Sequence, residues 1–402
     1  MLKNLLEYLR LAYKKFAKPL GVIIIVAVIF VLGLLVGQGR ISVGRHQGLT
    51  GLPAQLDYSS VNQVYDALKD NYNGKLSETQ LLNGLKHGLA TATNDPYTEY
   101  FTASEAKSFT NELNNSFSGI GAELGEDTNG NIEIISPISG FPADKAGLLP
   151  QDLIATINGQ STSGMSVDTA VNDVRGKSGT TVSLGIVRGN QQLTINVVRQ
   201  NIQVPSVNTK ILDGNIGYMQ ITTFADDTAQ LAQKAADTFK QDQVKGIVLD
   251  LRDDPGGLLD AAVSVSSLWV PEGSTIVQEK GTIGDITHTA GGGDELNGIP
   301  TVVLINSGSA SASEITAGAL HDNKVATLIG EKSYGKGVVQ QLINFNDGSE
   351  LKVTVASWYR PNGQNINKQG ITPDQIVGLS DADAKAGNDT QLQAAQAFLT
   401  KQ

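Results

Sequence analysis

Residues 245–257 read KGIVLDLRDDPGG, a short apolar run that gives way abruptly to charged residues, proline and paired glycine. A run of this length, bounded by turn residues, predicts a buried strand over residues 245–251 that ends in a loop. Residues 300–320, PTVVLINSGSASASEITAGAL, repeat the pattern and continue into a helix over residues 311–320. Further strands are expected over residues 326–329 and 351–356. Strands that alternate with helices predict an α/β core.

Two of these strands end in turns whose residues could take part in catalysis. Gly256 and Gly257 let the backbone turn with its N–H groups exposed, which fits an oxyanion hole, although a tight turn alone has the same signature. Ser311 is expected where a strand passes into a helix, and the positive end of the helix dipole there stabilises developing negative charge. The spacing of Ser311 and Glu314 also fits plain N-capping. On the residues alone, both interpretations of each turn stay open.

A third segment, EKSYGKGVVQ at residues 331–340, imitates a phosphate-binding loop when Gly330 is included. Gly337 stands where such a loop needs Ser or Thr to bind magnesium. The residues that follow are β-branched and predict a strand instead of the required helix. An NTPase is therefore excluded.

Two pairs fit the S-x-x-K signature of penicillin-recognising enzymes, Ser104 with Lys107 and Ser333 with Lys336. The companion motifs S-D-N and K-T-G do not occur in the sequence. Gly335 also weakens any helix that would bring Ser333 and Lys336 to one face. This class of enzyme is excluded as well.

The choice of a general base favours lysine over histidine. A triad of Ser311, His321 and Asp322 fails on distance, because ten residues along a helix separate the serine from the histidine by about 15 Å. Lys336 lies among glycine and valine with no adjacent acid. Burial in such surroundings depresses the pKa of an ammonium group and supplies the neutral amine that a Ser–Lys pair needs.

The composition excludes further classes of protein. The 402 residues include no cysteine, which removes disulfide frameworks and thiol nucleophiles, and the four histidines have no metal-binding spacing. Neither a metal nor another cofactor is expected. The formal net charge is −10 and the first forty residues carry +5, so the remainder carries −15. An acidic body argues against a nucleic-acid partner, which requires a basic face.

The N-terminal part predicts a membrane anchor. Seventeen apolar or glycine residues, 20–36, follow a basic segment, and as a helix they would extend about 26 Å. No small-residue cleavage site follows them, and the basic residues place the tail in the cytoplasm. We therefore expect a single-pass protein of the cell membrane, with its N-terminus cytoplasmic and everything after about residue 40 extracytoplasmic.

Between the anchor and the α/β core, the sequence changes character twice. Residues 58–113 have helical apolar spacing, and Ser77 with Gln80 forms a capping-box pattern at the start of the second helix. Residues 114–200 are rich in short β runs, among them a hairpin with its turn at Gly189-Asn190. The expected divisions are a cytoplasmic tail (1–19), an anchor (20–37), a linker (38–57), a helical segment (58–113), a β-rich domain (114–200), and an α/β core with a C-terminal helix (201–402).

The β-rich stretch resembles a PDZ domain. Residues 146–159, AGLLPQDLIATING, are similar to the core motif of that family. The resemblance implies that a peptide joins a sheet edge and that backbone amides hold its terminal carboxylate. The loop implied for that carboxylate comprises Gly119, Ile120, Gly121 and Ala122.

The three core motifs together resemble the carboxyl-terminal processing peptidases, tail-specific proteases with a Ser–Lys active site. The likeness extends from about residue 58 to residue 399 and implies a PDZ domain inserted in an α/β serine-protease core. It implies Ser311 as nucleophile, Lys336 as general base and Gln340 as the group that holds the lysine amine. The implied oxyanion donors are the N–H of Ala312 and the Gly-Gly turn, with Gly257 favoured over Gly256. Structural, supporting roles fall to Arg252, Glu314 and Asp322.

The expected function is that of a membrane-anchored serine endopeptidase that recognises protein tails and forms an acyl-enzyme. Its partners would be protein or peptide substrates with free, apolar C-termini, with the membrane bound through the N-terminal helix, and self-association is left open. The alternative is a catalytically silent PDZ scaffold or adaptor. An intact set of Ser311, Lys336 and Gln340 favours the enzyme.

Overall fold

The computed structural model describes residues 55–282, 284–380, 382–383 and 386–401. The expected tail and anchor, residues 1–37, and most of the expected linker lie outside this part of the chain. Among the described residues, no helix is both long enough and apolar enough to span a bilayer.

A six-stranded sheet forms the centre of the core. Its order is β10-β11-β12-β15-β16-β19, parallel throughout except for the antiparallel β10–β11 pair at one edge. Its strands are β10 (Val207–Leu212), β11 (Ile216–Ile221), β12 (Gly246–Asp250), β15 (Thr301–Ile305), β16 (Thr327–Gly330) and β19 (Gln375–Ile376). The predicted α/β core and its buried strands are confirmed.

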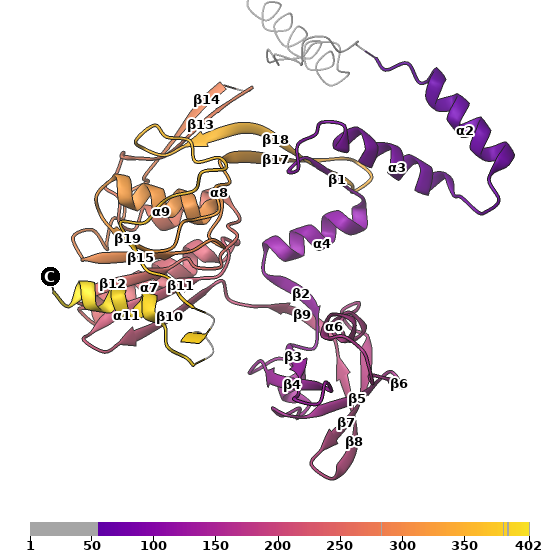
Figure 1. The fold of residues 1–402 in the computed structure, drawn as a ribbon, viewed down its shortest axis with the longest axis horizontal. Coiled ribbons are helices and arrows are strands. Elements are labelled where there is room, and N and C mark those ends of the chain that lie inside the picture. The colour runs from indigo at the N-terminus through magenta and orange to yellow at the C-terminus, as the bar shows by residue number, and fades with distance from the viewer. Residues whose placement is uncertain (1–54, 283, 381, 384–385, 402) are drawn as a thin grey trace, which may run out of the picture. The chain divides into compact units, whose positions relative to one another are not determined.

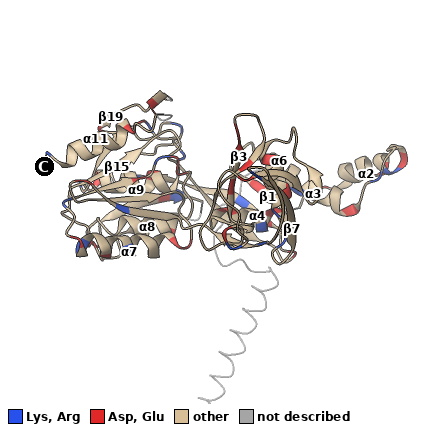
Figure 2. Cartoon of the chain, turned by 90° about the horizontal axis from the view of Figure 1, so that it is seen from below, with Lys and Arg blue, Asp and Glu red and all other residues tan. Residues whose placement is uncertain are grey.

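Helices cover both faces of this sheet. Three helices, α7 (Thr228–Gln241), α8 (Leu259–Ser266) and α9 (Ala312–Asp322), share one apolar core with the side chains of Ile247 and Leu249. The C-terminal helix α11 (Thr390–Leu399) packs on the other face, where Val248 points. Figure 1 shows α8 and α9 on one side of the sheet and α11 on the other, and Figure 2 shows α11 across the sheet from α7 and α8. Basic residues are dispersed among acidic ones in Figure 2. Successive side chains of β12 therefore point alternately into two apolar cores, one on each face of the sheet.

A second, antiparallel sheet is built around one long strand. β18 (Glu350–Tyr359) pairs with β17 (Val338–Asn344), β13 (Thr275–Gly281) and the three-residue β1 (Glu99–Phe101), and β14 (Gly284–Thr289) pairs with β13. β1 precedes the β-rich region in the chain and β18 follows it. The β-rich region is therefore an insertion within the core, as the sequence predicted.

The β-rich region forms its own core around Ile134 and Leu184. Its sheet has the order β3-β4-β5-β7-β8, with β6 on β5, and the predicted hairpin is confirmed by pairing of Arg188 with Gln191 across Gly189-Asn190. The strands are β3 (Ala122–Glu126), β4 (Ile132–Pro137), β5 (Leu153–Ile157), β6 (Gln160–Ser161), β7 (Thr181–Arg188) and β8 (Gln191–Val198). Two helices accompany them, α5 (Pro142–Lys145) and α6 (Val167–Val174), and β2 (Ser116–Gly119) pairs with β9 (Gln200–Gln203).

The residues expected as a helical segment form α2 (Ser59–Asn71), α3 (Glu78–Thr91) and α4 (Ala103–Leu113). The predicted capping box is present, since Ser77 N–H donates to Gln80 and Gln80 N–H donates back to the Ser77 hydroxyl. Within the part of the chain that the structure describes, several apolar side chains of α2 and of α3 are exposed. Val64 of α2 is 61% exposed and Leu89 of α3 is 55% exposed. Helical spacing fixes which side chains share a face, but burial needs a facing apolar surface.

Candidate active site

Ser311 lies at the N-cap of α9, directly after the turn that leaves β15. Its backbone has φ 53° and ψ −113°, a left-handed conformation that non-glycine residues seldom adopt. Such strain persists only where the surroundings hold the residue, and it is commonest at functional sites. Ser311 is thus held in place by its neighbours and not by its own conformational preference.

Glu314 is the group that holds the turn. Its carboxylate is fully buried and accepts the N–H of Ser311 at 3.0 Å and the N–H of Lys336 at 2.9 Å. It also accepts the N–H of Gly335 at 2.7 Å and the hydroxyl of Ser333. Burial raises the pKa of Glu314, and these four hydrogen bonds act in the opposite direction. One carboxylate therefore joins the serine turn to the lysine loop.

The Gly-Gly turn lies against the serine turn. Gly256 (φ 98°) and Gly257 (φ 145°) both need glycine, and a Cβ on Gly256 would come within 2.8 Å of the Ala312 nitrogen. The Gly256 N–H donates to Asp254 Oδ1 at 2.8 Å. Within the described part of the chain, the N–H groups of Gly257 and Ala312 have no hydrogen-bond acceptor. These two donors are the ones that the sequence analysis favoured.

Lys336 is in the segment between β16 and β17 and is mostly withdrawn from solvent. Burial lowers the pKa of its ammonium group, and the positive charge of Lys352 lowers it further. The negative charges of Glu314 and Asp95 act in the opposite direction, but the net shift is downward. The Lys336 carbonyl accepts the indole N–H of Trp358 at 2.8 Å, which fixes the backbone. Because the pKa is lowered, the neutral amine of Lys336 forms more easily than that of an exposed lysine.

Two residues near Lys336 were missed by the sequence analysis. The Lys336 Nζ lies 5.1 Å from the centre of the Tyr97 ring, within the range of a cation–π contact. Asp95, two residues earlier, accepts the Thr98 hydroxyl at 2.7 Å and its charge acts on Lys336. Both belong to the segment before β1, which the pairing of β1 with β18 and the hydrogen bond from the Thr354 N–H to the Thr98 hydroxyl bring here.

The side chain of Gln340 makes a different hydrogen bond from the expected one to the Lys336 amine. Its side-chain amide donates to the Thr354 hydroxyl at 3.3 Å. A register shift between Val339 and Gln340 breaks the regular pairing of β17 with β18 at this point. No hydrogen bond between Gln340 and Lys336 occurs among the described residues, so that contact stays a prediction. Gln340 nevertheless lines the same cleft as Ser311 and Lys336.

That cleft has a volume of about 380 Å³ and brings the predicted groups together. Ser311, Ala312, Gly256, Gly257, Lys336 and Gln340 all line it. Its remaining wall is mostly apolar and includes Leu113, Leu258, Ile315, Val338 and Trp358. A polypeptide with apolar side chains fits such a wall.

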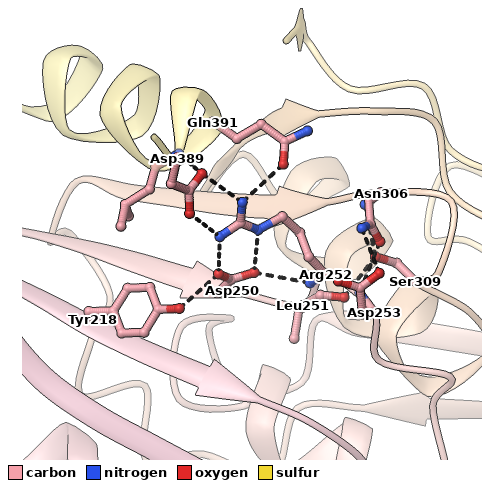
Figure 3. Close-up of polar contacts among 10 residues, drawn as sticks. Tyr218, Asp250, Leu251, Arg252, Asp253, Asn306, Ser309, Asp389 and Gln391 are labelled. Carbon is pink, nitrogen blue, oxygen red and sulfur yellow. Dashed lines mark hydrogen bonds and ion pairs between the residues drawn. The ribbon is translucent and has the colours of Figure 1, made fainter. Parts of the chain in front are cut away.

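Arg252 does not line the cleft and forms ion pairs elsewhere in the core. It binds Asp250 at the end of β12 and Asp389 at the start of α11, and both ion pairs are shorter than 3 Å (Figure 3). Burial lowers the pKa of Arg252, but the hydrogen bonds to these carboxylates outweigh it and raise the pKa. These contacts are compatible with a structural role for Arg252, which stays a prediction.

Side-chain hydrogen bonds tie the loop after Arg252 to the serine turn (Figure 3). The Ser309 hydroxyl donates to the Leu251 carbonyl at 2.7 Å, and the Asn306 amide donates to Asp253 at 2.8 Å. The loops that follow β12 and β15 are thereby fastened to each other.

His321 and Asp322 lie at the far end of α9 from Ser311. Asp322 binds Arg360, and His321 contacts Asp322 and Asp374, which lines a different cavity. Neither residue lines the cleft of Ser311, as the helical distance predicted.

The inserted β-rich domain has an open strand edge next to the loop that the PDZ resemblance implies. β3 is an edge strand, and α6 packs beside it. Before β3, the carbonyls of Ile120 and Gly121 accept the N–H groups of Ala143 and Ile138. The N–H groups of Ile120 and Gly121 have no acceptor in the described part of the chain. An open strand edge that starts with unpaired N–H groups suits a peptide with a terminal carboxylate.

The fold and the cleft define a serine peptidase that carries a PDZ domain. Residues 215–377 match the family model for peptidase family S41, and residues 109–187 match the PDZ domain. The chain belongs to the carboxy-terminal processing proteases of family S41 and is a serine-type endopeptidase.

Two relatives and one solved structure show the extent of the similarity. The carboxy-terminal processing protease CtpA of Bacillus subtilis (strain 168) is 38% identical over 370 residues, which are 92% of this chain and 78% of the relative. A probable CtpA-like serine protease of Staphylococcus haemolyticus (strain JCSC1435) is 40% identical over 360 residues, 89% of this chain and 71% of the relative. A putative S41 protease from Bacteroides fragilis NCTC 9343 shares the fold at 17% identity, with a TM-score of 0.56 over 87% of this chain and 99% of the other.

Proposed function

We propose that the chain is a membrane-anchored, extracytoplasmic processing protease that captures protein C-termini with its PDZ domain and cleaves by a Ser–Lys mechanism. One observation carries the mechanism: the buried carboxylate of Glu314 binds the backbone of both Ser311 and Lys336, and both residues line one cleft. A nucleophile and a desolvated amine held to a common group are the parts that such a reaction needs.

In the proposed reaction, the Ser311 hydroxyl oxygen attacks the scissile carbonyl carbon and its proton passes to the Lys336 amine. The N–H groups of Gly257 and Ala312 bind the oxygen that becomes negative. The C–N bond then breaks as Lys336 returns the proton to the leaving amine, and an ester on Ser311 remains. Water hydrolyses this acyl-enzyme by the same proton path.

The pH dependence of this mechanism follows from the lysine. Because the pKa of Lys336 is lowered mainly by burial, the neutral amine becomes available at a lower pH than for an exposed lysine. The protonated form cannot accept the serine proton. kcat/KM therefore rises with pH on the acid side of the profile.

Substrate selection would depend on the PDZ edge and its carboxylate loop. Amidation of a peptide substrate at its C-terminus removes a charge from the hydrogen bonds to the N–H groups of Ile120 and Gly121. Since such a hydrogen bond is worth about 1.5–3 kcal/mol, we expect kcat/KM to fall roughly ten- to a hundredfold. The measurement compares one peptide with its amide at matched salt.

The Gly121→Ala variant is the control for this comparison. Gly121 has φ 73°, and a Cβ would lie 2.6 Å from the Phe141 Cβ, so the carboxylate loop must distort. The variant should cleave the acid and the amide at similar rates, close to the wild-type rate for the amide. Equal rates for acid and amide in the wild-type enzyme would mean that this loop does not select tails.

The anchor and the extracytoplasmic location rest on residues 1–40, whose charge and apolar run favour a single span with the tail inside. The full chain should sediment with membranes and resist extraction at high pH. Without residues 1–40, the catalytic part should be recovered in the soluble fraction. Protease added to intact spheroplasts should digest the full chain. Survival of the catalytic part there, or sedimentation of the shortened chain with membranes, would contradict the proposal.

A further inference from the structure

Asp254 is a buried acid that the mechanism above does not use. It has no solvent exposure and lies between β12 and the Gly-Gly turn. Its Oδ1 accepts the Gly256 N–H at 2.8 Å, whereas its Oδ2 is buried without any hydrogen-bond partner. A buried oxygen without a partner is costly and calls for an explanation.

The main chain of Asp254 makes the connection to the nucleophile. Its carbonyl accepts the N–H of Ala310 at 3.0 Å and the hydroxyl of Ser313 at 2.9 Å, on either side of Ser311. One residue thus binds the serine turn through its carbonyl and the Gly-Gly turn through its carboxyl group.

We propose that Asp254 is a positioning residue of the oxyanion hole, whose carboxyl group binds the Gly256 N–H and so leaves the Gly257 N–H for the substrate. The active form is the uncharged acid. In that form the proton occupies Oδ2, Oδ1 remains the acceptor for Gly256, and no negative charge stands beside the oxyanion. The inference rests on the proposed Ser–Lys function and deepens it.

The surroundings of Asp254 favour the uncharged form. Burial raises its pKa to about 7, against the lowering effects of the Gly256 N–H and of the Ser313 hydroxyl. None of the charged groups of the surrounding elements makes a hydrogen bond or ion pair with its carboxyl group among the described residues. These groups are Arg252 and Asp253 on the same loop, Asp227 before α7, Asp260 of α8, Glu314 of α9, and Lys336 across the cleft.

Loss of the Asp254 proton should lower kcat, because it places a negative charge beside the oxyanion. As the pH rises through the pKa of Asp254, the acid loses its proton and a buried anion forms next to the developing oxyanion. Like charges repel strongly where water is excluded. kcat should therefore fall on the alkaline side, while Lys336 governs the acid side. KM should change little, because the oxyanion exists only after attack.

The Asp254→Asn variant tests this in the full chain with a free-acid peptide. Asparagine keeps an oxygen for the Gly256 N–H and cannot ionise. We expect the acid limb of the pH profile to persist and the alkaline limb to disappear. The ratio of variant to wild-type kcat should rise at least about tenfold between about pH 6 and about pH 9. The control is Asp237→Asn, an exposed acid of α7, which should keep the wild-type profile.

An alkaline limb that persists in Asp254→Asn would overturn the inference, and so would a loss of kcat that is uniform over pH. If the variant does not fold, NMR of isotope-labelled aspartate carboxyl groups in the wild-type enzyme decides instead. One aspartate should titrate near neutral pH, and its absence would overturn the inference. A Ser311→Ala enzyme that still cleaves would instead overturn the proposed function itself.

Discussion

Ser311→Ala and Lys336→Ala should each lower kcat/KM by at least about 10⁴-fold while the protein stays folded. Alanine at position 311 has no nucleophile, and alanine at position 336 leaves no group to accept the serine proton. Lys336→Arg should be equally inactive, because a guanidinium stays protonated at any relevant pH. The measurement is cleavage of an unstructured protein, with the thermal unfolding midpoint recorded for each variant.

His321→Ala is the matched control for these substitutions. His321 belongs to α9, the helix that Ser311 caps, but it contacts Asp322 and Asp374 and does not line the cleft. Its loss should leave most of the activity. A folded His321→Ala enzyme without activity would contradict lysine as the base.

Glu314→Ala should impair both catalysis and stability. The change leaves three backbone N–H groups and one hydroxyl without their buried acceptor, at about 1–3 kcal/mol for each group. Ser311 would no longer be held at its strained backbone angles. We expect kcat/KM to fall by about 10²–10³-fold and the free energy of unfolding by at least about 4 kcal/mol, the sum of the lower values for the four groups. Denaturant unfolding and peptide cleavage measure the two effects.

Glu314→Gln separates these two effects. Glutamine keeps the volume and one oxygen, but its NH₂ group must face some of the N–H donors of Ser311, Gly335 and Lys336. Activity should fall while much of the stability remains. Glu279→Gln is the control, because Glu279 is also buried but binds His288 on the antiparallel sheet. Wild-type kcat/KM in Glu314→Gln would show that the carboxylate does not position the site.

The parts of the fold that the sequence predicted are those with a local signature. The apolar runs of β12 and β15, the small-residue start of α9 and the Gly189-Asn190 hairpin depend on neighbouring residues alone. The helical distance from Ser311 to His321 could be calculated before any tertiary contact was known. These features remain recognisable because each follows from local backbone geometry.

The parts that the sequence missed depend on distant contacts. β1 has three residues, too few for a periodic pattern, so nothing indicated that Asp95 and Tyr97 would lie beside Lys336. The register shift that turns Gln340 toward Thr354 has no local signal either. The helical spacing predicted that α3 exists but not how far its side chains are buried, because burial also needs a facing apolar surface, and Leu89 is 55% exposed.

The long strand β18 limits how this enzyme can change during divergence. It pairs with β1 through Lys352, with β17 through Thr354 and with β13 through Tyr359. Since neighbouring residues point to opposite faces, insertion of one residue within β18 would exchange the two faces at all later positions. Changes in the length of the turn at residues 345–349 should leave the active-site cleft in place. Insertion or deletion of one residue inside β18 should instead destroy the cleft in a single event.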